Sequence, residues 1–425
     1  CIKSFRTKKP GQTTSAERFK KCTKEALPER PGIRERKTGR KLRQAVTNLF
    51  CQEDIIMKKK VLAVLLGGCM VVGMLAGCGS KADDTKKADG DTKTEGSGDS
   101  KGYHFEVVVK SFQSSYWQAA VQGINQACDE LGVTANTTGP NAESDIADQV
   151  NMLNNAINKN PDGIALAACD QNSVLDSLQS ALDKKIPVVC FDSGVPDAPE
   201  GSVYATVVTD NEQAGGIAAE HIYEAIKDRI GKVRVGEVNQ DATSANISER
   251  GMGFINKFIE LAKADGKTVA VVGNDFYVNQ VKDNGDQASA DVVLEVAVPA
   301  QTTVELCATE ASNIMNKDDT IAMFGSNQVS AEGVLTANQN LNKLGTDDDK
   351  IVAAGFDAGS VIKAAVKDGT LLGAVTQSPL MQGKISIETL AKICDGESVE
   401  DVTTDGYWYD STNMDDEDIS PNLYD

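Results

Sequence analysis

Polar side chains follow most of the apolar segments that have the pattern of strands in this sequence. They include carboxylates, which accept hydrogen bonds, an arginine, which donates them from a planar fork, and amides, which do both. Two adjacent aromatic residues add flat apolar surface. This mixture suits an uncharged ligand with several hydroxyl groups, such as a sugar, and it rejects analogues that lack a hydroxyl. The set is Ser114, Tyr116, Trp117, Asp192, Asp210, Asn239, Asp241, Asn246, Arg250, Asn327, Asp357 and Gln377.

Each residue of this set also has a purely structural interpretation. An Asp or Asn after a strand often caps the next helix, and Asp210 followed by Asn211 is the most typical cap of the set. Trp117 fits the apolar stripe of a helix, so a place in the core and a place in a binding site both stay open for it. Arg250 lies near a predicted helix start, where the helix macrodipole disfavours a cation, and this favours a functional role.

The elements that position these residues alternate between strands and helices. Phe105–Val109 is a β-branched run, and the residues up to Leu131 then carry apolar side chains at the i, i+3, i+4, i+7 spacing of an amphipathic helix. Repetition of this pattern to Cys394 predicts parallel sheets covered by helices on both faces. We expect an α/β fold of two doubly wound parallel-sheet lobes joined by a multi-strand hinge, with the ligand beyond the carboxyl ends of the strands.

No element is predicted between Val272 and Thr320. The predicted strands are Phe105–Val109, Val133–Thr138, Gly163–Ala168, Ile186–Phe191, Val203–Val208, Val233–Val238, Thr268–Val272, Thr320–Gly325, Ile351–Phe356 and Leu372–Thr376, with Asp405–Asp410 as a last crossing strand. After the first helix, the predicted helices are Ser144–Asn158, Ser173–Leu182, Glu212–Ile226, Ile247–Leu261, Ala331–Asn338, Ser360–Lys367 and Met381–Cys394.

Charge and cysteine content narrow the classes of partner and chemistry. The net charge is −19, and residues 1–56 hold an excess of nine positive charges, so the remainder carries −28 and disfavours nucleic acid and anionic membranes as partners. The cysteines have no metal-ligand spacing and the chain has two histidines, so neither a zinc site nor a histidine-based hydrolase is expected. Five cysteines are expected to be small buried apolar residues, and a Cys169–Cys190 bridge stays open: Cys128, Cys169, Cys190, Cys307 and Cys394.

The N-terminal part of the sequence differs from the rest. Residues 1–56 are basic and lack periodicity, and we expect them to be a mis-called extension, with a genuine basic tail as the alternative. From Met57, a charged start precedes the apolar run Val61–Ala76, as in a secretory signal peptide, which we place at 57–78. Its glycines make this run marginal for a membrane-spanning helix. Residues 79–102 are almost devoid of apolar side chains and are predicted to be a flexible tether.

The end of the predicted signal, Leu75-Ala76-Gly77-Cys78, resembles the lipobox of bacterial lipoproteins. The resemblance implies cleavage before Cys78 and addition of lipid to its thiol. The mature protein is then expected at the extracytoplasmic face of the cell membrane, held there by a lipid anchor.

Seven short motifs along the body of the chain point to a family. Together they extend from about Tyr103 to Asp425 and resemble the ribose- and galactose-type sugar-binding proteins of ABC importers, which have the type I periplasmic-binding fold. The resemblance implies an N-terminal lobe of residues 103–209 plus 378–405 and a C-terminal lobe of 210–377 plus 406–425, with a hinge near Asp210, Gln377 and Asp405. The motifs are Ser111–Gln118, Pro187–Asp192, Thr209–Ile222, Ser248–Phe254, Phe324–Asn327, Ala353–Asp357 and Ala374–Gly383.

The same resemblance assigns roles to individual residues. The aromatic pair is expected to stack on the sugar ring, the acidic and amide residues to bind its hydroxyls, and the arginine to reach it from the second lobe. The implied ligand-binding residues are Ser114, Tyr116, Trp117, Asp192, Ser193, Asn246, Arg250, Asn327, Asp357 and Gln377.

Some positions depart from the family pattern. Ser193 stands where the ribose-type pattern has arginine, and Ser114-Ser115 replaces the usual Asn-Pro, so both argue against ribose itself. Phe276 and Tyr277 are candidates for the aromatic residue that the family places in the second lobe. A galactose-type calcium loop is not visible, so no metal is expected.

We therefore expect an extracytoplasmic solute-binding protein that captures a monosaccharide or related polyol and delivers it to an ABC permease. It is expected to be a monomer and not an enzyme, without a cofactor or a nucleic-acid partner. One alternative is a sugar-sensing receptor for a chemoreceptor or a sensor kinase. Another is a glycosidase, because Asp192 and Asp357 could form a carboxylate pair. Neither a nucleophile elbow nor a P-loop supports an enzyme.

Overall fold

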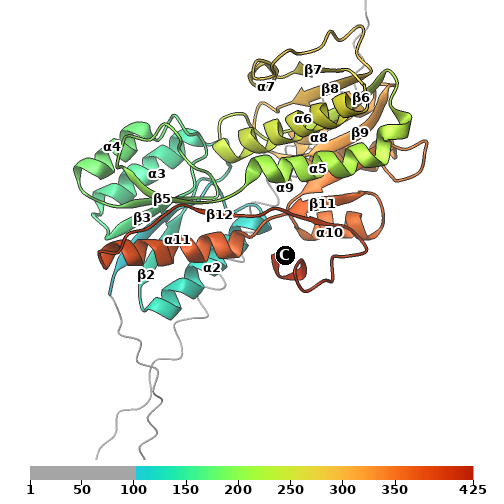
Figure 1. The fold of residues 1–425 in the computed structure, drawn as a ribbon. Helices are drawn as coiled ribbons and strands as arrows, with labels where there is room; N and C mark the ends of the chain where they lie inside the picture. Colours follow the sequence, from blue (N-terminus) through green and yellow to red (C-terminus); the bar gives the residue numbers. More distant parts are fainter. Residues whose placement is uncertain (1–101, 425) are drawn as a thin grey trace, which may run out of the picture. The chain divides into compact units, whose positions relative to one another are not determined.

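The computed structural model describes residues 102–424, which form two lobes, each a sheet flanked by helices (Figure 1). The predicted extension at 1–56, the signal peptide at 57–78 with Cys78, and nearly all of the tether at 79–102 lie outside the described residues. Within the described part of the chain, no helix has the length and hydropathy needed to cross a membrane.

The sheet of the first lobe has six strands in the order β12-β5-β4-β3-β1-β2, and every neighbouring pair is parallel. Strands β3 and β4 are buried along their whole length, which explains their continuous apolar sequences. The bounds are β1 His104–Val108, β2 Thr134–Thr138, β3 Gly163–Leu166, β4 Val188–Phe191, β5 Val203–Thr209 and β12 Val402–Thr404.

Helices cover both faces of this sheet, as side chains alternate along its strands. On β1, Val107 packs in the cluster with α2 (Ser115–Leu131) and α11 (Pro379–Cys394), whereas Val108 packs in the cluster with α3 (Ile146–Asn158) and α4 (Leu175–Asp183). Helix α11 comes from far along the chain, so the first lobe is completed by the C-terminal quarter of the sequence (Figure 1).

The sheet of the second lobe has seven strands in the order β13-β11-β10-β9-β6-β8-β7. Six of them run parallel, and β13 pairs antiparallel with β11. Its strands are β6 Val233–Val238, β7 Val269–Gly273, β8 Val292–Ala297, β9 Thr320–Gly325, β10 Val352–Phe356, β11 Gly373–Thr376 and β13 Tyr407–Tyr409. Its helices are α5 Asn211–Ile226, α6 Ala245–Ala264, α7 Asp275–Val278, α8 Val304–Met315, α9 Gln328–Leu341 and α10 Ser360–Lys367.

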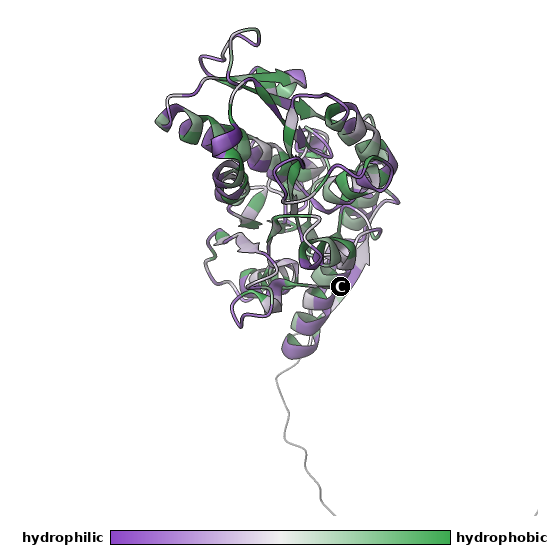
Figure 2. Ribbon diagram, turned by 90° about the vertical axis from the view of Figure 1, so that its right-hand side faces the viewer, coloured by the Kyte–Doolittle hydropathy of each residue, from purple (hydrophilic) through white to green (hydrophobic). Residues whose placement is uncertain are grey.

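Green apolar segments form the interior of both lobes and purple hydrophilic ones lie outside (Figure 2). In the second lobe, α5 and α6 pack on one face of the sheet around Phe254 and Phe324, whose stacked rings have centroids 4.6 Å apart. Helices α8, α9 and α10 cover the other face. The core therefore has the two helix layers that the alternating sequence pattern predicts.

The structure corrects four predictions. The sequence Val292–Ala297 forms β8, beside the inner strand β6, and Val304–Met315 forms α8, so this region holds two elements where none was expected. Strand β12 was also not predicted, and the antiparallel β13 breaks the expected all-parallel order. Glu295 in the middle of β8 interrupts its apolar run, since its carboxylate faces Arg234 at 2.6 Å instead of entering the core.

In each lobe, glycines allow two helices to approach each other very closely. A Cβ atom at Gly123 of α2 or Gly383 of α11 would collide with the backbone of the other helix. The same holds for Gly215 of α5 and Gly253 of α6, and Gly215 lies against the backbone of Arg250. Glycine is required at these positions because only its missing side chain lets the backbones approach so closely.

The chain passes between the two lobes at three places. It leaves β5 at Thr209 to enter α5, leaves β11 at Thr376 to enter α11, and leaves β12 at Thr404 to enter β13. The side chain of Asp210 accepts a hydrogen bond from the backbone N–H of Gln213, which confirms its interpretation as a helix cap.

Cys169 and Cys190 carry free thiols, so they form no bridge. Cys128, Cys169, Cys190 and Cys307 are buried, as predicted, while Cys394 is partly exposed. Burial raises the pKa of the Cys190 thiol to about 12, and it is therefore an unreactive apolar side chain.

Candidate functional site

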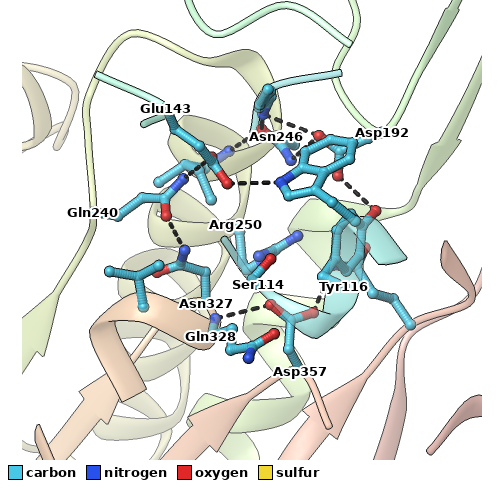
Figure 3. A pocket seen from close by; sticks show the side chains of 15 residues that line it. Ser114, Tyr116, Glu143, Asp192, Gln240, Asn246, Arg250, Asn327, Gln328 and Asp357 are labelled. Atoms are coloured by element: carbon cyan, nitrogen blue, oxygen red, sulfur yellow. Dashed lines mark hydrogen bonds and ion pairs between the residues drawn. The ribbon is translucent and has the colours of Figure 1, made fainter. Parts of the chain in front are cut away.

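A polar pocket lies between the lobes, at the carboxyl ends of the strands (Figure 3). The space among its side chains is about 320 Å³, part of which opens to solvent. Its lining comes from loops and helix starts that follow β1, β2, β4, β6, β9, β10 and β11, where parallel strands deliver backbone and side-chain groups to one edge. The lining residues are Lys110, Ser114, Tyr116, Trp117, Glu143, Asp192, Gln240, Asn246, Ile247, Arg250, Asn327, Gln328, Val329, Asp357 and Gln377.

Nine of the ten residues predicted from the sequence line this pocket, and Ser193 does not. Ser193 is fully buried beside Asp192, and its hydroxyl has no hydrogen-bond partner among the described residues. Phe276 and Tyr277 also lie away from the pocket. Phe276 is exposed, and Tyr277 is buried in the second-lobe core, where its hydroxyl donates to the backbone oxygen of Asp241 at 3.2 Å.

The aromatic wall of the pocket belongs to the first lobe. Tyr116 and Trp117 lie in the first turn of α2, with ring centroids 5.0 Å apart and planes at 84°. Trp117 also packs in the core cluster around Phe105, so this residue belongs to the core and lines the pocket as well. Its indole N–H donates to Glu143 at 2.8 Å, which fixes the ring at the pocket wall.

A charged cluster lies beside this wall. The Lys110 ammonium is 3.0 Å from the carboxylate of Asp192, and both side chains are buried. Asp192 also accepts hydrogen bonds from the Tyr116 hydroxyl at 2.6 Å and from the Asn246 amide, which comes from the second lobe, at 3.1 Å. Burial lowers the pKa of Lys110, but the charges of Asp192 and Glu143 outweigh it and raise that pKa above its usual value. Lys110 is therefore a fixed cation.

Arg250 brings a second cation from α6 of the other lobe. Its guanidinium lies 3.6 Å from the centre of the Phe356 ring, as in a cation–π contact. It donates to the Ser326 backbone oxygen at 2.9 Å and to the Asn211 side chain at 2.7 Å. These bonds lock the side chain, while its Nε atom is buried without a hydrogen-bond partner in the described part of the chain.

The second acidic residue of the pocket is Asp357, which follows β10. It accepts hydrogen bonds from the Gln328 backbone N–H at 2.9 Å and from the Gln377 amide at 2.8 Å. Burial raises the pKa of Asp357 despite the opposing charge of Arg250. The carboxylate therefore occupies a site where additional hydroxyl donors would stabilise its charge.

Six lining residues were not predicted from the sequence: the polar Lys110, Glu143, Gln240 and Gln328, and the apolar Ile247 and Val329. Glu143 accepts hydrogen bonds from Trp117 and from the Gln240 amide at 2.7 Å, and Gln240 in turn contacts Asn327. Burial raises the pKa of Glu143. Only Lys110 has a sequence signal, as it ends the apolar run of β1 with a charge, whereas Glu143 lies in an irregular loop.

The two lobes touch directly around the pocket. The Lys110 ammonium donates to Asn246 at 2.9 Å, and Glu143 accepts from Gln240. At the rim, the hydroxyl of Thr243 donates to the backbone oxygen of Cys169 at 3.2 Å. The structure therefore shows the lobes in a closed arrangement, in which groups of both lobes reach the same enclosed space.

The other polar residues singled out at strand ends have local roles. Asn239 donates to Glu237 at 2.9 Å inside the second lobe. Asp241 accepts hydrogen bonds from the backbone N–H groups of Thr243 and Ser244, both at 3.0 Å, and so shapes the loop before α6. Neither residue lines the pocket.

Comparison with known proteins agrees with this geometry. Residues 105–398, more than half of the chain, match the family described as periplasmic binding protein domain. The D-allose-binding periplasmic protein of Escherichia coli (strain K12) is 23% identical over 291 residues, which cover 67% of this chain and 83% of that protein.

Two solved structures are also similar. One, named ABC transporter, LacI family transcriptional regulator, from Brachyspira murdochii, is 31% identical with a TM-score of 0.64, over 76% of this chain and 99% of that one. The other is an ABC transporter solute binding protein from Agrobacterium vitis with bound D-fucose. It is 26% identical with a TM-score of 0.62, over 76% of this chain and all of that one. The predicted two-lobed α/β fold is thereby confirmed, and the chain belongs to the family of periplasmic binding protein domains.

Proposed function

We propose that this protein captures a monosaccharide, or a related polyol, outside the cytoplasm and delivers it to an ABC permease. The observation that carries the proposal is the convergence of aromatic rings, carboxylates and amides in one pocket between two lobes. The names of the relatives support it, since one is described as D-allose-binding and another contains D-fucose.

The pocket offers both kinds of partner that a sugar needs. Asp192 and Asp357 can accept hydrogen bonds from hydroxyls, and the Nε–H of Arg250, which has no hydrogen-bond partner among residues 102–424, can donate one. The rings of Tyr116 and Trp117 present flat surface to the C–H face of a pyranose. Three carboxylates face two cations in this lining, so the pocket favours an uncharged sugar over a uronate or a sugar phosphate.

Capture by closure of the lobes is part of the proposal. The three crossings near Asp210, Gln377 and Asp405 form a hinge about which the lobes open and close. The lobe boundaries at 103–209 plus 378–405, and at 210–377 plus 406–425, remain our assignment. The direct contacts between lobes, such as Glu143 with Gln240, support it because they hold the closed form around the pocket.

We also propose that the protein is anchored to the outer face of the cell membrane through lipid on Cys78 and acts as a monomer. The position of Cys78 after an apolar run supports the anchor. Wild-type protein should label with a radioactive fatty acid and fractionate with membranes, and Cys78→Ala should do neither. Label retained by the variant would refute the anchor without affecting the sugar site.

The test of the binding function is a thermal-shift panel on residues 103–425 with pentoses, hexoses, deoxysugars, polyols and nucleosides. A ligand present at 100 times its dissociation constant stabilises the folded protein by about 2.7 kcal/mol, which shifts the melting temperature by several degrees. One strong sugar hit, confirmed by titration calorimetry, is the expected result. A panel with no sugar or polyol hit would contradict the proposal.

The proposal assigns no chemical step to the pocket. Incubation with aryl glycosides should release no phenol, since Asp192 and Asp357 are held by Lys110 and Gln377 for binding. Release that depends on either carboxylate would instead establish a glycosidase.

A further inference from the structure

The segment Asp410–Tyr424, here called the strap, follows β13 and lies over the second lobe. It begins with a tight turn, in which the Asp410 carboxylate accepts from the backbone N–H of Thr412 at 2.8 Å and from the Trp408 indole N–H at 3.1 Å. Further along, Met414, Ile419 and Leu423 pack against the second-lobe core cluster that includes α8, α9 and α10. The greater part of the strap therefore belongs to the second lobe.

The end of the strap is fastened to one of the crossings between lobes. The Thr376 hydroxyl donates to the backbone oxygen of Asn422 at 2.7 Å, and the Ser378 hydroxyl donates to the Asn422 side chain at 2.6 Å. In Figure 1 the red end of the chain reaches the space between α10 of the second lobe and the helices α2 and α11 of the first. The strap is thus tied to the segment that leads from β11 to α11.

Tyr424 differs from the rest of the strap because it contacts both lobes. It packs against the second-lobe cluster, as Leu423 does, and also against the first-lobe cluster around Trp117. Its ring meets the Tyr116 ring edge to face, with centroids 6.0 Å apart and planes at 76°. Burial, and next the charge of Asp357, raise the pKa of the Tyr424 hydroxyl well above its usual value, so this group stays protonated beside that carboxylate.

Through these contacts Tyr424 lies against residues from two opposite walls of the pocket. Tyr116 carries the aromatic wall of the first lobe and bonds to Asp192, and Asp357 is the acidic wall of the second. Tyr424 does not line the pocket itself. Its contacts with both walls require the closed arrangement, because opening of the lobes would pull Tyr116 and Asp357 apart.

We infer that Tyr424 is a positioning residue that fixes Tyr116 and Asp357 relative to each other, so that the strap couples ligand binding to closure of the lobes. This inference rests on the proposed sugar-binding function of the same pocket. It adds a residue, and a segment of the chain, that the sequence motifs do not indicate.

The test compares Tyr424→Ala and Tyr424→Phe with a matched control, Tyr223→Phe. Tyr223 likewise has a buried ring, and it lies in the second-lobe core away from the pocket, where its hydroxyl donates to the Asp265 carboxylate at 2.8 Å. For the sugar found in the panel, Tyr424→Ala should weaken affinity about tenfold or more, chiefly through faster dissociation, because fewer contacts hold the closed form. Tyr424→Phe should restore most of the loss, and Tyr223→Phe should change affinity less than twofold.

Dissociation can be followed by the fluorescence of Trp117 in a Trp408→Phe background, since the chain has two tryptophans. A merely structural role would lower the stability of Tyr424→Ala and leave its dissociation rate unchanged. Affinity and dissociation rate of Tyr424→Ala within twofold of wild type would overturn the inference, while a sugar hit with wild type would leave the binding function standing.

A second measurement needs no ligand and decides the case if the panel is flat or if Tyr424→Ala folds poorly. Free energies of unfolding of Tyr116→Leu, Tyr424→Leu and the double variant form a mutant cycle that removes the two contacting rings, beside the unrelated cycle of Tyr116→Leu with Tyr223→Leu. Non-additive stability for the first pair and additive stability for the second are expected. Additivity in both cycles would overturn the inference.

Discussion

The two aspartates of the pocket have the same backbone conformation. Asp192 follows β4 and Asp357 follows β10, each directly after a phenylalanine, and both have left-handed φ values, 62° and 71°. The backbone N–H of Asp192 donates to Val207 of the neighbouring strand at 3.0 Å, and that of Asp357 donates to Val375 at 2.7 Å. Aspartate tolerates this conformation better than most residues do. The two lobes therefore present their carboxylates with the same local geometry.

The carboxylates of Asp192 and Asp357 have different kinds of partner. Asp192 has a buried ion pair with Lys110 and a short bond from the Tyr116 hydroxyl, both within its own lobe. Asp357 accepts from neutral groups, and within residues 102–424 no Lys or Arg nitrogen lies within 4.0 Å of its carboxylate. The two aspartates thus share a backbone conformation but differ in charge compensation. The charge of Asp192 is largely neutralised by Lys110, and that of Asp357 is not.

This difference separates structural from ligand-binding roles. A carboxylate tied to a buried cation is needed to keep that cation compensated, whereas a carboxylate with neutral donors keeps its charge for hydroxyls of a ligand. We therefore expect Asp192 to matter most for stability and Asp357 to matter most for affinity.

The largest effect is expected from Asp192→Ala. Loss of the carboxylate leaves the Lys110 ammonium buried without its counterion, and removing one partner of a buried pair costs about 3–5 kcal/mol of folding free energy. Urea unfolding followed by circular dichroism measures it. Adding Lys110→Met should recover a large part of the loss. A single variant less than about 1 kcal/mol below wild type would show that Asp192 is not structural.

A smaller effect, on binding, is expected from Asp357→Asn. The amide keeps the shape and an acceptor oxygen but removes the charge, and a hydrogen bond to a charged group is worth about 1.5–3 kcal/mol. Affinity for the sugar should fall by about that amount, with folding free energy changed by less than about 1 kcal/mol. Asp265→Asn, which removes a charge that accepts from Tyr223 away from the pocket, is the control. Unchanged affinity in the Asp357 variant would remove it from the site.

The contrast between these residues shows what the sequence can and cannot predict. Asp192 and Asp357 could be found because each ends a readable apolar strand, and a parallel sheet brings strand ends together. Lys110 could be suspected from its place after the run of β1, but its pairing with Asp192 depends on the order of strands in the sheet. Glu143 could not be found, because an irregular loop offers no periodicity from which to place a side chain.

The fold itself was predicted except where local patterns were ambiguous. The missed β8 has an apolar sequence, but Glu295 in its middle and the polar stretch before it concealed a strand that pairs with β6. Tyr277, proposed for the pocket, is drawn into the second-lobe core by its large apolar ring. Tyr424 carries no motif, and its contacts with both lobes arise from the path of the chain after β13.

The electrostatic contrast also predicts a dependence on pH. Burial raises the pKa of Asp357 above that of the unfolded chain, so the folded state holds this proton more tightly. Its contribution to stability is fully present below the usual aspartate pKa and is lost as pH rises through the raised value. Relative to Asp357→Asn, wild type should therefore gain stability as the pH is lowered from 7 to 4. Parallel stability curves of the two proteins, obtained by urea unfolding, would contradict this.

The smallest effect tests the shared backbone rather than the charges. Once the carboxylate is removed, glycine fits a left-handed residue better than alanine does, by about 1 kcal/mol, because alanine brings its Cβ against the following carbonyl oxygen. Asp357→Gly should thus be more stable than Asp357→Ala. The same difference is expected between Gly and Ala at position 192 in a Lys110→Met background, where no uncompensated charge interferes. Equal Gly–Ala differences in folding free energy at the two positions, measured by urea unfolding, would show that the two strand ends share a backbone conformation and differ only in their charges. A difference confined to one position would mean that the strand ends are not equivalent.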